Sequence, residues 1–140
     1  MECNNKRSVI YGIWNTTSYS LSTNSVTTAT PEELTLKLYS GCIRFIKLAD
    51  KAIVEENIQD KNTNIQKAQD IIRELMVTLN MDYDISHQLM PLYEYMHHQL
   101  TQANVKNDPS ILKEVQGMVE GFRETWQQVI KANKLQTQAR

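Results

Sequence analysis

The sequence predicts an all-α protein, an antiparallel four-helix bundle with an irregular N-terminal cap segment. Three observations support this prediction. Apolar residues recur at spacings of three and four in four separate stretches, Thr30-Pro31 and Asp108-Pro109 have the cap-then-proline pattern of helix starts, and the connections are short. Short connections place consecutive helices antiparallel, which is typical of a bundle.

The composition indicates one compact domain without extreme charge. The chain has 140 residues and a formal net charge of −1, and its basic and acidic residues are interleaved, so we expect no nucleic-acid partner. No stretch is long enough to span a bilayer, and the apolar stretch at 9–14 is too short for a signal peptide, so we expect no membrane insertion. Cys3 and Cys42 are too few for a disulfide framework and suit the cytosol.

Residues 1–29 are expected to form an arm that precedes the bundle. They are rich in Ser, Thr and Asn and lack helical periodicity, yet they are more apolar than a plain linker. We expect this arm to fold back over apolar surface as a cap, with Ile10, Ile13, Trp14 and Tyr19 among its contacts. The alternative is a chain end that is merely ordered or frayed.

The first helix is expected to begin after Thr30. Thr30 suits the N-cap, Pro31 is preset for the first helical position, and Glu33 can complete a capping box. The expected end is Glu55-Glu56-Asn57, because Asn tolerates the left-handed conformation that closes many helices.

The apolar surface of this helix is wider than one buried face needs. At about 100° per residue, its apolar side chains cover an arc of roughly 200°. Either two neighbouring helices cover both flanks, or a partner outside the domain covers one of them. Leu36, Tyr39 and Ile43 lie at the edge of the main stripe or outside it, so they are candidates for partner contact.

A second helix is expected over about 61–80. Its apolar residues alternate spacings of three and four, which is typical of a seam between packed helices. The seam residues are Ile65, Ala68, Ile72, Leu75 and Leu79. Ile71 lies beside this seam and is a further candidate for partner contact.

The third helix is expected to start at Ser86 as N-cap. Its inward face is expected to hold Leu89, Leu92, Tyr93, Met96, Leu100 and Ala103. Tyr95 points away from that face and is another candidate for partner contact. Pro91 removes a backbone hydrogen bond, so the helix either kinks there, which we favour, or begins its regular part at the proline.

The fourth helix is expected from Asp108-Pro109 to about Lys131, which gives a bundle over 30–132 and a polar tail over 133–140. Its inward residues are Leu112, Val115, Val119, Phe122, Trp126 and Ile130. Gly117 and Gly121 fall on the outward face, where each costs up to about 1 kcal/mol relative to Ala. Either they allow a partner's backbone to approach closely, or the surface simply tolerates them.

The sequence offers no catalytic constellation. Glu94 and His97 have the E-x-x-H spacing of di-iron bundles, but such a site needs a second copy and two more carboxylates. The other histidines, His87 and His98, belong to the same helix. No nucleophile set, phosphate loop or zinc spacing is present. We expect neither an enzyme nor a bound metal or cofactor, and a bundle metalloprotein is kept as the weaker alternative.

Several motifs, in order along all four helices, closely resemble the flagellar secretion chaperone FliS family. They are SVTTATPEELTL at 25–36, LYSGC at 38–42, KAQDIIREL at 67–75, LYEYM at 92–96, ANVKND at 103–108 and FRETW at 122–126. The resemblance spans residues 25 to about 131.

The resemblance implies a cytosolic export chaperone for flagellin. In that family a four-helix bundle binds the disordered C-terminal segment of flagellin, prevents premature polymerisation and delivers it to an export-gate component of the flagellar type III apparatus. A co-chaperone or flagellar assembly factor is a further candidate partner. The resemblance also implies that the N-terminal arm can cover the client surface. The other alternative to a chaperone is a structural module that dimerises through the first helix. A homodimer is therefore a further possible assembly of this chain.

Overall fold

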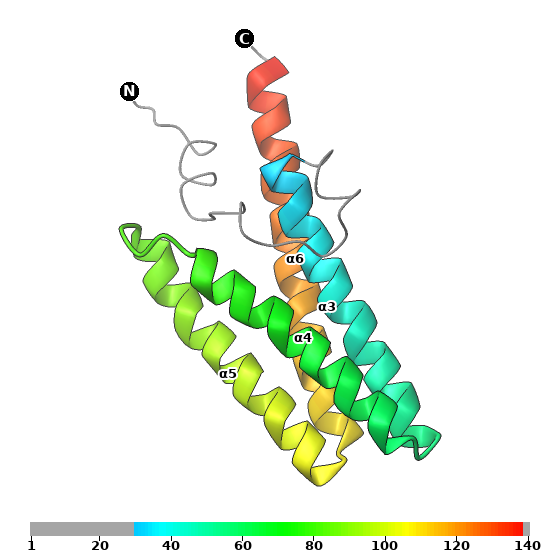
Figure 1. The fold of residues 1–140 in the computed structure, drawn as a ribbon. Helices are drawn as coiled ribbons and strands as arrows, with labels where there is room; N and C mark the ends of the chain where they lie inside the picture. Colours follow the sequence, from blue (N-terminus) through cyan, green and yellow to red (C-terminus); the bar gives the residue numbers. More distant parts are fainter. Residues whose placement is uncertain (1–29, 139–140) are drawn as a thin grey trace.

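The computed structural model describes residues 30–138, which form four α-helices in an antiparallel bundle (Figure 1). The helices are α3 (Pro31–Val54), α4 (Ile58–Thr78), α5 (Asp84–Lys106) and α6 (Pro109–Gln138). The predicted fold class is therefore confirmed. Across this described part of the chain, no helix combines the length and the apolar character needed to cross a membrane.

The predicted start of α3 is confirmed in atomic detail. The Thr30 hydroxyl oxygen accepts a hydrogen bond from the Glu33 backbone N–H at 3.1 Å, and the Glu33 carboxylate accepts one from the Thr30 N–H at 3.1 Å. Two otherwise unpaired donors are thereby satisfied by one capping box.

The connection between α3 and α4 differs from the prediction. Glu56, not Asn57, takes the left-handed conformation, with a φ of 57°. Asn57 instead acts as the N-cap of α4, where its side-chain oxygen accepts from the Asp60 N–H at 3.0 Å. α4 therefore starts at Ile58, three residues before the predicted start, because the Asn side chain satisfies a helix donor there.

The predicted cap of α5 at Ser86 is wrong. The helix begins at Asp84, and Ser86 is a fully buried residue of its first turn. Tyr83 occupies the N-cap position without a side-chain cap bond. Because α5 starts before Pro91 and continues through it, the alternative in which the regular helix begins at the proline is also wrong.

α6 is longer than predicted. It continues to Gln138, beyond the expected end near Lys131, and Asn133 is buried. The predicted start is confirmed, since the Asp108 carboxylate accepts from the Ser110 N–H at 2.9 Å. The Trp126 indole N–H donates to the Glu32 carbonyl at 3.0 Å, which ties α6 to the first turn of α3.

The bundle consists of two helix pairs that close around one core. α3 packs against both α4 and α6, and α5 packs against α4 and α6. Two neighbours therefore flank the wide apolar arc of α3. α5 and α6 lie close where they are joined and diverge towards the start of α5 (Figure 1).

Candidate partner-binding surface

Two of the three partner-contact candidates on α3 lie in the core. Tyr39 and Ile43 are each only 3 % exposed and belong to the main apolar cluster. Leu36 is partly buried and packs against the same cluster. Tyr39 and Ile43 therefore offer little surface to a partner in the chain alone, because their flank of the helix is part of the core cluster, and their contact with a partner stays a prediction.

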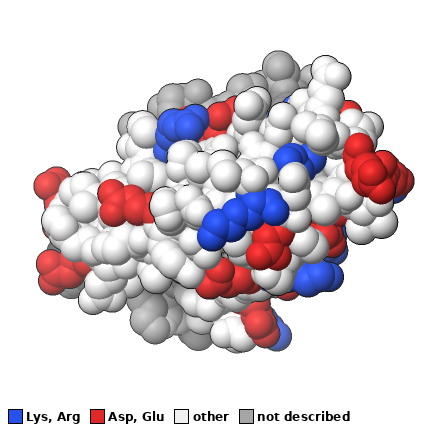
Figure 2. Space-filling view, turned by 90° about the horizontal axis from the view of Figure 1, so that it is seen from below, with Lys and Arg blue, Asp and Glu red and all other residues white. Residues whose placement is uncertain are grey.

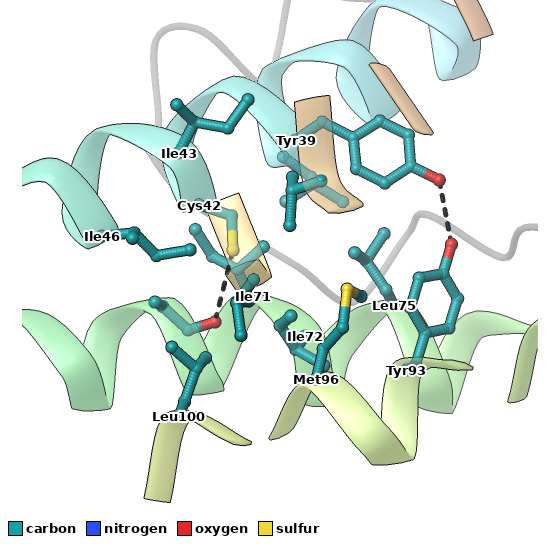
Figure 3. Packing of buried hydrophobic residues seen from close by; sticks show 14 of the residues in the cluster. Tyr39, Cys42, Ile43, Ile46, Ile71, Ile72, Leu75, Tyr93, Met96 and Leu100 are labelled. Carbon is teal, nitrogen blue, oxygen red and sulfur yellow. Dashed lines mark hydrogen bonds between the residues drawn. The ribbon is translucent and has the colours of Figure 1, made fainter. Parts of the chain in front are cut away.

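Tyr39 has a specific partner inside the bundle. Its hydroxyl forms a 2.9 Å hydrogen bond with the hydroxyl of Tyr93 from α5, and Figure 3 draws this bond across the core. The Phe122 ring from α6 stacks on Tyr39 with centroids 6.1 Å apart. Burial raises the pKa of both phenols, so they stay neutral. The aromatic group links three helices and is structural.

Ile71 and Cys42 are also core residues. Ile71 is fully buried in the chain without a partner, and its role in partner contact stays a prediction. Its position beside the seam of α4 faces other helices of the bundle, because α4 packs against both α3 and α5. Burial raises the pKa of the Cys42 thiol to about 12, and the thiol points to the Ala68 carbonyl (Figure 3). Cys42 therefore behaves as the small apolar residue that the sequence indicated.

Three of the remaining candidates, Tyr95, Gly117 and Gly121, come from α5 and α6. Tyr95 is 42 % exposed, and its hydroxyl donates to the Glu114 carboxylate at 2.6 Å. Gly117 and Gly121 follow Glu114 by about one and two turns on α6, so they share its face. We call this face, made of Leu92, Tyr95, Gln99, Glu114, Gly117 and Gly121, the α5/α6 surface.

Leu92 extends the apolar part of this surface. It was predicted to face inward, but it is 42 % exposed, so that prediction is wrong. Leu92 lies at the edge of the apolar stripe of α5, where periodicity alone does not decide whether a side chain is covered. Leu92 and Tyr95 are three residues apart and therefore neighbours on the helix surface.

Glu114 is the polar centre of the α5/α6 surface. Besides the Tyr95 hydroxyl, its carboxylate accepts from the Gln99 amide at 3.0 Å. The hydrogen bond from Tyr95, and then that from Gln99, lowers the pKa of Glu114, while the same bond raises the pKa of Tyr95. Glu114 is thus an anion at neutral pH. The sequence does not single out Glu114, since an exposed Glu on a helix has no distinguishing pattern.

The two glycines leave open space on this face. A Cβ atom built on Gly117 or Gly121 meets no other atom within 4 Å, and neither residue has a positive φ. No contact within the described chain therefore requires glycine at these positions. This geometry is compatible with both alternatives: a partner's backbone approaches the glycines closely, or the surface tolerates glycine there without a role.

The Glu94–His97 pair lies in a groove between α4 and α5 of about 420 Å³. The His97 ring nitrogen is 3.1 Å from the Arg73 guanidinium, and Arg73 pairs with Asp70 at 2.9 Å. Burial, followed by the nearby Arg73 charge, lowers the pKa of His97. Within the described residues, no three His, Cys, Asp or Glu side chains gather closely enough to hold a metal ion.

A second feature that the sequence does not single out lies where the α3–α4 and α5–α6 connections meet. Lys61 is buried, and its ammonium donates to the Asn104 carbonyl at 3.0 Å and to the Asn107 side-chain oxygen. It thereby satisfies the end of α5. Figure 2 shows this end of the bundle, where acidic and basic side chains are interspersed among uncharged ones. No basic patch forms on this face.

The predicted cap residues lie outside the described part of the chain. Ile10, Ile13, Trp14 and Tyr19 all fall within residues 1–29. Their contact with the bundle stays a prediction.

Comparisons with known proteins converge on one family. The family model of the flagellar protein FliS matches residues 15–133. The flagellar secretion chaperone FliS of Bacillus subtilis (strain 168) is 50 % identical over 111 residues, which cover 79 % of this chain and 84 % of the relative. The Vibrio cholerae protein of the same name is 33 % identical over 108 residues, covering 76 % and 79 %.

The similarity extends to a relative of lower identity and includes part of the arm. The Escherichia coli (strain K12) flagellar secretion chaperone FliS is 28 % identical over 115 residues, covering 80 % of this chain and 85 % of the relative. The family match begins at residue 15, ten residues before the motifs recognised in the sequence. Since it also runs through α3, α4, α5 and most of α6, this four-helix chain belongs to the flagellar protein FliS family.

Proposed function

We propose that this chain is a cytosolic export chaperone that binds the disordered C-terminal segment of flagellin. In this role it prevents premature polymerisation and delivers the client to an export-gate component of the flagellar type III apparatus. Membership of the FliS family and relatives named flagellar secretion chaperones support the proposal. A co-chaperone or flagellar assembly factor is a further partner. The chain acts by binding and is not an enzyme.

The observation that carries the proposal is the exposed α5/α6 surface. Leu92 and Tyr95 present large side chains on α5, and Gly117 and Gly121 leave open space on the outward face of α6. An amphipathic helix binds in such a setting through apolar side chains at helical spacing. We therefore place one helical part of the client on this surface.

The energetics require further contacts elsewhere on the bundle. Covering one large apolar side chain contributes about 1.5–3 kcal/mol, whereas ordering a disordered partner costs several kcal/mol. Leu92 and Tyr95 are each 42 % exposed, so covering what remains of them contributes less than this and does not by itself offset the ordering cost. The client must therefore extend beyond the α5/α6 surface, and its affinity is spread over many contacts.

The test is co-expression with a flagellin C-terminal fragment, followed by co-purification and calorimetry. We expect a stable complex, and we expect Leu92→Asp to weaken it about tenfold or more, because the carboxylate would be buried without a partner. Leu48→Asp on α3 is the matched control, since Leu48 is similarly exposed, at 37 %.

Each outcome has a separate meaning. A fragment that does not bind the unaltered chain overturns the proposed function. A fragment that binds Leu92→Asp as tightly as Leu48→Asp removes the α5/α6 surface from the client site. Circular dichroism of both variants establishes that the bundle is intact.

A further inference from the structure

Glu114 is a fixed negative charge in the middle of the α5/α6 surface. The Tyr95 hydroxyl and the Gln99 amide approach its two oxygens separately, at 2.6 and 3.0 Å. Both donors are neutral, so they orient the carboxylate without cancelling its charge. The lowered pKa of Glu114 agrees with this anionic state.

No basic side chain of the described residues balances this charge. The ion pairs between described residues are Lys51–Glu55, Arg73–Asp70 and Lys113–Asp50. Lys113, the neighbour of Glu114 in the chain, reaches Asp50 on α3. The carboxylate is exposed in the free chain, where water solvates it.

A client that covers this surface changes the surroundings of Glu114. A helix lying over Leu92, Tyr95 and the two glycines would remove water from the carboxylate, and removing water from a charge is costly unless an opposite charge replaces it. A purely apolar client face would therefore bind poorly here. A cation on the client helix, next to its apolar face, offsets the cost of removing water from Glu114.

We propose that the α5/α6 surface selects a client helix that carries a Lys or Arg beside its apolar face, and that this cation pairs with Glu114. The inference rests on the proposed function, because it concerns the same client site. Tyr95 and Gln99 act as positioning residues that hold the carboxylate towards the surface. Glu114 then determines which segment, and which face of it, is accepted.

The test compares Glu114→Gln with the unaltered chain in calorimetric titrations with a flagellin C-terminal fragment. Gln keeps the size of the side chain and an acceptor for the Tyr95 hydroxyl but removes the charge. We expect binding about three- to tenfold weaker in about 50 mM salt and a difference below about twofold in about 1 M salt, where ions screen the pair. Glu120→Gln is the matched control, because Glu120 lies on α6 and accepts from Gln116, four residues earlier.

A charge exchange identifies the client residue. Each Lys or Arg of the fragment is replaced in turn by Glu and titrated against Glu114→Lys. We expect one replacement, and no other, to restore binding. If Glu114→Gln binds within about twofold of the unaltered chain in low salt while Leu92→Asp still weakens binding, the inference is overturned and the proposed function stands. A fragment that does not bind the unaltered chain overturns both.

Discussion

Ile43 illustrates how neighbours decide the role of a single residue. Its position outside the main stripe of α3 is what a partner-facing residue would have, yet it is 3 % exposed. Tyr95 has a comparable position on α5 and is 42 % exposed. Helical periodicity gives the direction of a side chain relative to its own helix, but burial depends on what packs beside it.

This difference makes a prediction for Ile43. We expect Ile43→Asp to lower the free energy of unfolding by about 3 kcal/mol or more, because it removes buried apolar contacts and buries an unpaired carboxylate. Thermal and urea unfolding followed by circular dichroism measure the effect. Ser40→Asp is the control, because Ser40 is exposed on α3 and accepts a hydrogen bond from Arg123. Equal stability of the two variants would contradict the burial of Ile43.

At the scale of the element, helix ends follow local chemistry. The capping box at Thr30 and the Asp108-Pro109 start of α6 were both predicted, because each depends on residues within three or four positions. Asn57 and Ser86 were misassigned for a related reason. Both residue types serve as caps, but the choice between ending one helix, starting the next or packing inside is made by the surrounding chain.

The two glycines of α6 allow a prediction at this scale. We expect Gly117→Ala and Gly121→Ala each to stabilise the bundle by about 0.5–1 kcal/mol, since both positions are helical and open. We also expect each to weaken binding of the flagellin fragment about fivefold or more, because the added methyl group pushes the client helix away.

A glycine with a binding role is recognised by a substitution to Ala that raises the stability of the bundle but lowers its affinity for the fragment. At a glycine that is merely tolerated, the substitution raises stability and leaves affinity unchanged. Gln127→Ala, at an exposed position of the same helix, is the control and should change neither quantity by much. Stabilised variants that bind the fragment normally would mean that the surface merely tolerates Gly117 and Gly121.

At the scale of the whole molecule, the bundle hides most of its apolar surface and leaves a limited part uncovered. The core draws on α3, α4, α5 and α6, and the wide arc of α3 faces two neighbours. The apolar side chains that stay exposed in the described chain are spread over all four helices, and Leu92 and Tyr95 on the α5/α6 surface are two of them. A bundle whose helices diverge can keep a stable core and still offer a binding face.

The N-terminal arm is expected to compete with the client for the client-binding surface of the bundle. We predict that deleting residues 1–20 tightens binding of the flagellin fragment, because a chaperone that covers its own surface binds with an affinity reduced by the open fraction. If the arm covers the surface in nine molecules out of ten, deleting it raises the apparent affinity for the fragment about tenfold. Calorimetry of the full and shortened chains measures it. Weaker binding after deletion would mean that the arm contacts the client directly.

Short-range spacing and capping were enough to predict the four helices, the start of α3, the start of α6 and most of the core. The family motifs were also readable along the chain. The burial of Tyr39, Ile43 and Ile71, and the placing of Leu92, Tyr95 and Glu114 on one exposed face, depend instead on how the helices pack. Periodicity fixes directions around one helix axis, whereas exposure depends on the angle and distance between axes.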